Sequence, residues 1–299
     1  MTALWQRHPV GIVGLGLIGG SLGLDLLARG ATVRALVHRQ ATADRARQRG
    51  LASEVSTDPA VLRDCALVVL ALPLDRLLEP SAALLAALPP AAVITDVGSV
   101  KGPVLAAWTA RLGPERSSRF VASHPMAGTT QAGVEAGAAG LFRGRPWVAT
   151  PGADTDPAAL AVVAELAEAV GARWLTCAAA DHDRAVALIS HLPVLVSAAL
   201  LQAADHGAAA APALDAGAAT LPQLVRLLAS SGFADTSRVG GGNPELGMLM
   251  AQGNREPLLA ALGQYRQALA DLEQLVASES WPELLASLAE AQRLRPQFL

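Results

Sequence analysis

The sequence predicts a two-part α/β fold, in which a doubly wound parallel sheet occupies residues 1–178 and an all-α domain occupies residues 179–299. In the first part, short apolar segments alternate with helical patterns. These segments are apolar at consecutive positions, which is typical of parallel strands whose two faces are both covered by helices. From about Ala179 onward the strand pattern disappears and long helical patterns follow. The change at this point predicts the domain boundary.

A glycine-rich turn follows the first predicted strand, Val10–Val13, and opens a helix that extends to Ala28. Gly14 permits the tight turn, Gly16 lets the backbone approach a pyrophosphate, and Gly19 lets the helix pack against the strand. The start of the helix also directs free N–H groups and the positive end of its dipole toward a phosphate. We therefore predict a dinucleotide-binding Rossmann domain, with a purely structural turn as the alternative. The predicted cofactor contacts at this turn are Gly14, Gly16, Leu17, Ile18 and Gly19.

The remaining elements of the first part follow from the same patterns. The predicted strands are Thr32–Val37, Ala66–Leu72, Ala92–Asp96, Phe120–Ser123, Trp147–Thr150 and Trp174–Cys177. The predicted helices are Thr42–Gly50, Leu77–Leu88, Gly102–Leu112 and Pro157–Val170. Pro80 falls in the first turn of the Leu77–Leu88 helix, and Pro89 and Pro90 end that helix.

Long helical patterns make up the second part. Asp181 can cap a helix that continues to Ala204, and Pro193 removes a backbone donor inside it, which predicts a kink. The alanine-rich connection Gly207–Ala219 has no clear pattern. Helices this rich in alanine and leucine bury more apolar surface than one subunit supplies, which favours a homodimer. The other predicted helices are Leu221–Ser231, Pro257–Glu279 and Trp281–Arg293.

The amino-acid composition indicates which kinds of molecule the protein binds. The chain has 23 basic and 26 acidic residues, a net charge of -3, which gives no electrostatic footprint for nucleic acid or an anionic membrane. A small-molecule substrate is therefore expected. Cys65 and Cys177 lie in apolar segments and are predicted to be packed thiols rather than a disulfide or a metal site. No apolar segment was found that approaches the roughly 18 residues of a membrane span, so a cytoplasmic protein is expected. Lys101, the single lysine, is predicted to be a helix-turn residue.

The loop after the second strand bears on the choice of cofactor. In the NAD-type motif an acidic residue ends this strand and contacts the adenosine ribose. Here the strand continues into His38 and Arg39, and no carboxylate precedes Asp44. The loop is either a solvated basic segment or a pocket for a 2′-phosphate, in which Arg39 supplies charge and His38 and Thr42 supply hydrogen bonds. The second interpretation predicts NADP.

Ligands of doubly wound sheets bind at the carboxyl ends of the strands, where Leu72, Ser99 and His124 are the candidate residues. Pro125 restricts the chain after His124, and small residues follow where a substrate needs space. The alternative for His124 is a histidine that caps a strand. Ser99 can cap the next helix or orient the imidazole, and both roles remain open.

Six stretches of the chain resemble the prephenate and arogenate dehydrogenases of tyrosine biosynthesis. They are GLGLIGGSL from Gly14, TDVGSVK from Thr95, SHPMAGT from Ser123, LFRGRPWVATP from Leu141, SHLP from Ser190 and GFADTSRVGGGNPELG from Gly232. They cover both predicted domains in the order of the family. The resemblance implies a nucleotide-binding domain, a helical dimerisation domain and an active site between them.

The resemblance also implies roles for single residues. His124 becomes the catalytic histidine with Ser99 as its support, Arg238 holds a substrate carboxylate, and His191 lines the same pocket. An ordinary surface arginine is the alternative for Arg238. In the implied reaction, hydride leaves ring carbon 4 for the nicotinamide, His124 takes the hydroxyl proton, and the ring loses carbon dioxide and becomes a phenol. No metal is expected. Further implied contacts are Thr129 and Thr130 for the substrate and Leu72 and Ser99 for the cofactor.

The substrate and the class of protein have alternatives. The ending GGGNPELG is most similar to cyanobacterial members, which favours arogenate over prephenate, while Thr130 and Gly247 stand at positions that vary in the family. Few residues precede or follow the two predicted domains in the sequence. The resemblance therefore implies an enzyme with a single activity and no regulatory domain. A β-hydroxyacid dehydrogenase needs a lysine in the second domain, and the chain has none beyond Lys101. A non-catalytic NADP-binding protein would not need His124 and Arg238 together.

Overall fold

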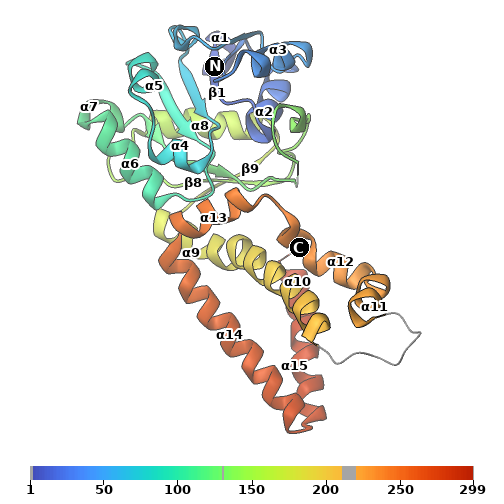
Figure 1. Cartoon of the computed structure of the whole chain (residues 1–299). Helices are drawn as coiled ribbons and strands as arrows, with labels where there is room; N and C mark the ends of the chain where they lie inside the picture. The colour runs from blue at the N-terminus through green and yellow to red at the C-terminus, as the bar shows by residue number, and fades with distance from the viewer. Residues whose placement is uncertain (1–2, 130, 211–219, 299) are drawn as a thin grey trace.

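The computed structural model describes residues 3–129, 131–210 and 220–298, which form a sheet-containing domain and a helical domain (Figure 1). Six parallel strands lie in the order β3-β2-β1-β4-β5-β6, which confirms the doubly wound parallel sheet. They are β1 Val10–Val13, β2 Val33–Leu36, β3 Glu54–Ser56, β4 Leu67–Leu70, β5 Val93–Asp96 and β6 Phe120–Val121. The edge strand β3 was not predicted. After β3 the chain crosses back over the sheet, and β4 is added on the other side of β1. The carboxyl ends of β1 and β4 therefore flank the crevice where such sheets bind ligands.

Helices cover both faces of the parallel sheet. They are α1 Leu4–Arg7, α2 Leu17–Leu27, α3 Gln40–Gln48, η1 Pro59–Leu62, α4 Leu74–Leu78, α5 Ala82–Ala87, α6 Gly102–Leu112, α7 Pro114–Ser117, η2 Val134–Ala136 and α8 Pro157–Ala169. Consecutive strand residues alternate between two cores: Ile12 and Val69 face α2 and α8, whereas Val13 and Leu70 face α4 and α6. This alternation explains why β1 and β4, at the centre of the sheet, have no polar side chain at any position.

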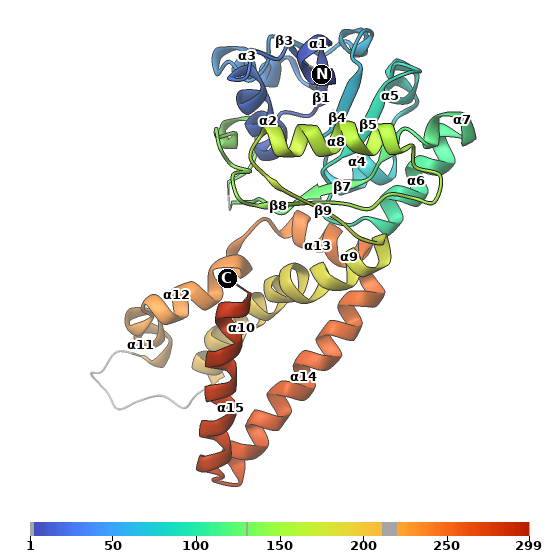
Figure 2. The ribbon, with the colours of Figure 1, turned by 180° about the vertical axis from the view of Figure 1, so that it is seen from behind.

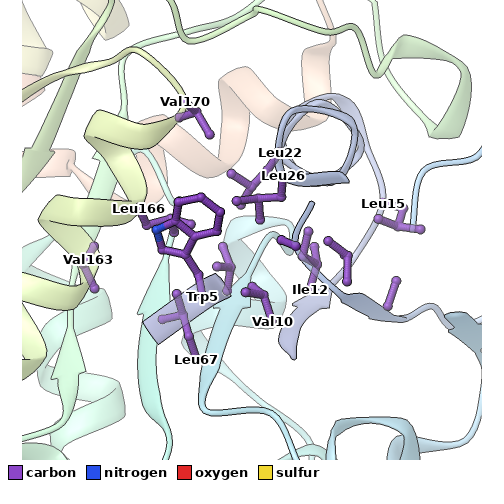
Figure 3. Close-up of a cluster of buried hydrophobic side chains, with 14 of the residues drawn as sticks. Trp5, Val10, Ile12, Leu15, Leu22, Leu26, Leu67, Val163, Leu166 and Val170 are labelled. Carbon is purple, nitrogen blue, oxygen red and sulfur yellow. The ribbon is translucent and has the colours of Figure 1, made fainter. Parts of the chain in front are cut away.

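Trp5 of α1 closes the first of these cores. Its indole lies near Leu22 and Leu26 of α2 and Leu166 of α8, and all four side chains are buried (Figure 3). Each buried side chain of this size contributes about 1.5–3 kcal/mol relative to an exposed one. The packing holds α2, and with it the glycine-rich turn, against the sheet.

A second, smaller sheet takes up strands that were expected to extend the parallel one. It consists of β7 Ser123–Pro125, β8 Pro146–Ala149 and β9 Arg173–Thr176. β7 pairs antiparallel with β8, and β8 pairs parallel with β9. The single strand predicted over residues 120–123 is wrong, because the chain leaves the first sheet after Val121 and joins the second at Ser123. His124 therefore lies inside β7 and not beyond the end of a parallel strand.

The helix predicted over residues 77–88 is also wrong, since α4 and α5 occupy this stretch. Pro80 lies between them, where it cannot supply the N–H that would continue the first helix. The hydroxyl of Ser81 then caps α5 by accepting a hydrogen bond from the amide of Leu84 at 3.2 Å. A proline followed by a capping serine thus separates two short helices.

The helical domain lies beside the second sheet, and α9 and α13 are the helices nearest to it (Figures 1 and 2). Two long antiparallel helices, α14 and α15, extend away from the first domain. Two helix ends differ from those predicted, because α10 continues to Ala210 and α11 ends at Leu228, and the helices α12 and α13 were not predicted. Residues 211–219 of the unplaced connection lie outside the described residues. The elements are α9 Ala179–Val186, a π-helical turn η3 Ala187–His191, α10 Leu192–Ala210, α11 Leu221–Leu228, α12 Ser231–Ser237, η4 Arg238–Gly241, α13 Pro244–Gly253, α14 Arg255–Ala277, α15 Trp281–Leu294 and η5 Arg295–Gln297.

The first long helix widens where a kink was predicted. Pro193 lacks the N–H that would bond to the carbonyl of residue 189, and the turn just before it is π-helical, with the amide of Leu192 bonded to the carbonyl of Ala187. The predicted cap is wrong, because Ala178 is the N-cap of α9 and Asp181 lies in its first turn. The wide turn contains His191, whose ring is buried.

The continuous helical stretch Ala179–Ala210 is long and apolar enough, by length and composition, to cross a membrane, and its most apolar window has a mean hydropathy of 1.9. The expectation that no apolar segment approaches the length of a membrane span is therefore wrong. The stretch carries four buried polar residues, His182, Asp183, His191 and Ser197, and α10 packs against η4. A single helix of this kind is weak evidence for a membrane span, because core helices have the same properties.

The two cysteines differ in their surroundings. Cys65 is buried, and burial raises its pKa to about 11. Cys177 is only half-buried, so the prediction of two packed core thiols holds for Cys65 alone. Both thiols are free.

Candidate active site

The turn between β1 and α2 has the geometry that a bound pyrophosphate requires. Gly14 has a φ of +95°, and a Cβ there would lie 2.3 Å from the carbonyl oxygen of Ala71. A Cβ on Gly19 would lie 2.0 Å from the carbonyl oxygen of Gly14, so only glycine lets α2 approach this closely. At Gly16, the N-cap of α2, a Cβ would meet no atom within 4 Å. This open space at a helix N-terminus fits a phosphate group.

Three further predicted cofactor residues border this turn. Leu17 and Ile18 form the first turn of α2, where backbone N–H groups have no partner within the helix. The side chain of Leu72, just after β4, reaches within 3.5 Å of the position of a Cβ on Gly14. The structure therefore brings these residues together at the crevice between β1 and β4.

The predicted 2′-phosphate residues lie at the adjacent strand end, between β2 and the first turn of α3. His38 and Arg39 are exposed, and Thr42 is half-buried. Arg39 is the N-cap residue of α3, and its side chain makes no capping hydrogen bond. The nearest carboxylate in the sequence, Asp44, pairs with Arg47 at 2.7 Å. This strand end is therefore basic.

A buried network connects the end of β5 to the start of β7. The Asp96 carboxylate accepts hydrogen bonds from the amides of Gly98 at 2.8 Å and Ser123 at 3.1 Å. The Nζ atom of Lys101 donates to Asp96 and to the carbonyl oxygen of Ser123, the latter at 2.7 Å. Lys101 is 0% exposed; burial lowers its pKa, and the Asp96 charge opposes that shift. The pair fixes the backbone immediately before His124.

His124 contacts a second histidine, which comes from the helical domain. Its Nδ1 atom lies 3.0 Å from Nε2 of His182, and the two rings meet edge to face with centroids 5.2 Å apart. The Nδ1 atom of His182 lies 2.8 Å from Oδ1 of Asp183. Within the described residues Nε2 of His124 makes no hydrogen bond, and it is not among the fully buried unpartnered atoms. This nitrogen is therefore accessible to a substrate.

The environment of His124 sets its charge. Burial lowers the pKa of His124 well below its ordinary value of 6.5, and the positive charge of Lys101 lowers it further. His124 is therefore neutral near pH 7, the form in which an imidazole nitrogen accepts a proton. For Asp183 burial raises the pKa, but hydrogen bonds from His182 and from two backbone amides outweigh it, so the net shift is downward. Asp183 is a carboxylate at neutral pH.

His191 presents an unpartnered nitrogen. The side-chain amide of Asn254 donates to the carbonyl oxygen of Asp183 at 2.7 Å and to Nδ1 of His191 at 3.1 Å. Nδ1 of His191 is thus an acceptor, and Nε2 carries the hydrogen of the neutral ring. Burial lowers the pKa of His191 to about 4. Within the described residues its Nε2 is buried without a hydrogen-bond partner.

Two predicted site residues are not joined to His124 by hydrogen bonds in the described part of the chain. Ser99 is half-buried, and the Nδ1 atom of His124 meets His182 instead of the serine hydroxyl. Arg238 is exposed at the start of η4. Two residues further on, a Cβ on Gly240 would lie 2.5 Å from the amide nitrogen of Ala198, so this glycine lets η4 pack closely against α10. The roles of Ser99 and Arg238 stay predictions.

The loop after His124 contains the two threonines that were predicted to contact the substrate. Thr129 is exposed, and its hydroxyl accepts a hydrogen bond from the amide of Gln131 at 3.2 Å. Thr130 lies outside the described residues. Among the described residues no group of three or more His, Cys, Asp or Glu side chains could hold a metal ion.

Two family models match the chain. The prephenate dehydrogenase nucleotide-binding domain matches residues 22–176, and the prephenate dehydrogenase dimerization domain matches residues 178–290. The chain belongs to the prephenate dehydrogenase family. The resemblance described above is thereby confirmed, and so are the Rossmann domain and the helical domain that follows it.

Relatives of this prephenate dehydrogenase family member match along almost its whole length. A cyclohexadienyl dehydrogenase from Zymomonas mobilis is 32% identical over 289 residues, which are 96% of this chain and 94% of the relative. The structure of Synechocystis arogenate dehydrogenase is 39% identical, has a TM-score of 0.77 and covers 97% of this chain and 100% of that chain. Prephenate dehydrogenase from A. aeolicus, solved with hydroxyphenyl propionate and NAD+, is 28% identical, has a TM-score of 0.85 and covers 97% and 98%. The protein is therefore an oxidoreductase of the prephenate and arogenate type that uses a nicotinamide dinucleotide.

Three buried polar side chains near His124 were not predicted as site residues: Lys101, His182 and Asp183. Lys101 was predicted to be a helix-turn residue, but it is buried against Asp96 because the backbone before His124 offers it a carbonyl partner. His182 and Asp183 were passed over in favour of the neighbouring Asp181. The signal in the sequence was weak, because His182 and Asp183 lie within a run of four polar residues, Asp181 to Arg184, that resembles an ordinary exposed helix start.

Proposed function

We propose that the enzyme oxidises and decarboxylates arogenate to tyrosine, with NADP as the hydride acceptor and His124 as the base. The observation that carries this proposal is the accessible Nε2 of a neutral, buried His124 at the junction of the two domains. Arogenate is supported by the 39% identity to Synechocystis arogenate dehydrogenase. Prephenate is the second candidate, supported by the structural similarity to the A. aeolicus enzyme at a TM-score of 0.85.

The glycine-rich turn would hold the pyrophosphate of the cofactor. Gly14 and Gly19 permit the close packing, and Gly16 leaves the space at the start of α2. Arg39 would pair with the 2′-phosphate of NADP, assisted by His38 and Thr42. The proposed contacts with the rest of the cofactor are Leu17, Ile18, Leu72 and Ser99.

The chain's own residues account for the chemistry. The bound nicotinamide supplies the hydride acceptor. His124 accepts the proton of the hydroxyl on ring carbon 4 at Nε2, and His191 donates Nε2–H to a polar group of the substrate. Arg238 pairs with a substrate carboxylate, and Thr129 and Thr130 line the same pocket. Loss of carbon dioxide leaves the bonding electrons in the ring, which becomes a phenol.

The oligomer and its location belong to the same proposal. Only 28% of the most apolar window of the Ala179–Ala210 stretch is buried within the single chain. A second copy packed on the helical domain would cover that surface, so we expect a homodimer in the cytoplasm. We place the domain boundary between residues 178 and 179, where β9 has ended and α9 begins.

A four-way steady-state assay tests the substrate and the cofactor together. Each of arogenate and prephenate is paired with each of NADP and NAD, and reduced nicotinamide is followed by absorbance. The highest kcat/KM is expected for arogenate with NADP. A higher value for prephenate would select the second candidate, and no turnover in any pairing would contradict the proposed reaction.

The Arg39→Ala variant tests the 2′-phosphate pocket. Loss of a charge-assisted contact should reduce the preference for NADP over NAD by about 10- to 150-fold. The kinetics with NAD should stay unchanged, because NAD has no 2′-phosphate. Arg111→Ala removes an exposed arginine of α6 and serves as the control. An unchanged preference in Arg39→Ala would show that this arginine does not read the phosphate.

A further inference from the structure

Three buried side chains form a line that ends at the accessible nitrogen of His124. Oδ1 of Asp183 lies 2.8 Å from Nδ1 of His182, and Nε2 of His182 lies 3.0 Å from Nδ1 of His124. His182 is 3% exposed, Asp183 is 6% exposed and His124 is 9% exposed. The line therefore runs through protein and not through solvent.

The chemistry of these groups fixes where the hydrogens lie. An ionised carboxylate only accepts, so Nδ1 of His182 must carry a hydrogen and donate it to Asp183. In a neutral ring the other nitrogen, Nε2 of His182, is then an acceptor. Because it faces Nδ1 of His124, that nitrogen must carry the hydrogen, and Nε2 of His124 is left with its lone pair.

We propose that Asp183 and His182 are a positioning pair, which holds His124 in the Nδ1–H tautomer and so leaves Nε2 free to accept the substrate's proton. The proposal rests on the proposed role of His124 as the base. Neither member of the pair touches the reacting atoms. Their effect is on the tautomer and the orientation of the His124 ring.

Asp183 also forms hydrogen bonds between the two domains, so the tautomer of His124 depends on the contact between them. The Asp183 carboxylate accepts hydrogen bonds from the backbone amides of Lys101 at 2.7 Å and Gly102 at 2.8 Å, at the start of α6 in the first domain. Asn254, at the start of α14, holds the carbonyl oxygen of Asp183 at 2.7 Å. The carboxylate that orients His182 is thus the group that caps a helix of the other domain. His124 lies in the first domain and its positioning pair lies in the second, so they meet only when the two domains are in contact.

Two variants of His182 separate positioning from packing. His182→Gln keeps an acceptor oxygen within reach of Nδ1 of His124, whereas His182→Leu removes the acceptor and keeps an apolar side chain. With Leu, kcat should fall by roughly 10- to 100-fold, the usual loss when the partner that orients a histidine is removed. The KM of His182→Leu should change little, and His182→Gln should retain most of the wild-type kcat. His8→Leu, an exposed histidine after α1, is the control.

Nitrogen-15 NMR of histidine-labelled enzyme reads the tautomer without any need for turnover. The His124 signals are assigned by their loss in His124→Asn. The proposal expects Nδ1–H and an unprotonated Nε2 in the wild type and in His182→Gln, and a mixture of tautomers in His182→Leu. A wild-type Nε2–H tautomer, or the same His124 signals and kcat in all three proteins, would overturn the proposal.

The two proposals fail in different ways. If His124→Asn turned over arogenate at the wild-type rate, the proposed function of His124 would fail, whatever the spectra showed. If His182→Leu and His182→Gln lost kcat equally while the His124 signals stayed unchanged, His182 would have a packing role and the positioning pair would be rejected. Thermal unfolding of each variant identifies any loss of fold.

Discussion

At the scale of single residues, burial sets which proton each histidine carries. His124 faces Lys101 from the start of α6 and His182 and His191 from the helical domain, and burial with these neighbours lowers its pKa well below 6.5. His191, in the helical domain, is neutral for the same reason, because burial lowers its pKa to about 4. A base with such a pKa keeps its lone pair through the physiological range.

The acidic side of the pH profile follows from this shift. The base works only when neutral, so activity persists as the pH falls through 6.5 and is lost only as the pH falls through the lowered pKa of His124. We expect kcat/KM to have its acidic limb below pH 6.5, measured with the fold checked by circular dichroism at each pH. An acidic limb at or above 6.5 would contradict the burial of this histidine.

Arg238 is expected to act on binding. Removing it in Arg238→Ala leaves a substrate carboxylate without a charged partner, and kcat/KM should fall by about 10- to 100-fold. Arg238→Lys should recover only part of this loss, because an ammonium keeps the charge but not the two-pronged geometry. Steady-state kinetics of both variants measure the effect. Unchanged kcat/KM in Arg238→Ala would make this exposed arginine an ordinary surface residue.

At the scale of elements, the buried Asp96–Lys101 pair links the end of β5 in the first sheet to the start of β7 in the second. In Lys101→Met the Asp96 carboxylate stays buried with no cation, so the free energy of unfolding should fall by about 3–5 kcal/mol. Urea denaturation measures the difference. Arg111→Met on the exposed side of the same helix should change stability by less than about 0.5 kcal/mol. Equal stability of Lys101→Met and wild type would show that the pair is dispensable.

The elements that the sequence predicts well are those with a local signal. Every residue of β1 and β4 is buried and none is polar, so their continuous apolar pattern identifies them. β3 has a single buried residue, Val55, between two polar ones, and gives no such signal. The second sheet depends on a hydrogen bond between Asp96 and Ser123, residues 27 positions apart. No local pattern reports a contact of that kind.

The candidate site divides in the same way. His124 and the glycine-rich turn were found because a strand pattern and small residues mark them in the sequence. His182 meets His124 across 58 positions, and only the packing of the helical domain on β7 brings them together. The Asn254 contact with His191 spans 63 positions. Such partners follow from the fold and not from spacing.

At the scale of the whole molecule, exposed apolar side chains predict the oligomer. On α15 Leu285 is 70% exposed and Leu288 is 55% exposed. The double variant Leu285→Glu/Leu288→Glu should shift sedimentation from dimer to monomer, because charge in an apolar interface is costly. Leu175→Glu, an exposed leucine of β9, is the matched control. A dimer unchanged by the double variant would place the interface elsewhere on the helical domain.

The central claim is that the two domains together form a dehydrogenase whose base is His124. Its most direct test is the turnover of His124→Asn with arogenate and NADP, alongside calorimetric binding of NADP to the same variant. Removal of the proton acceptor should lower kcat by roughly 10²- to 10⁴-fold, and cofactor affinity should stay at the wild-type value. A kcat within tenfold of the wild type would contradict the account.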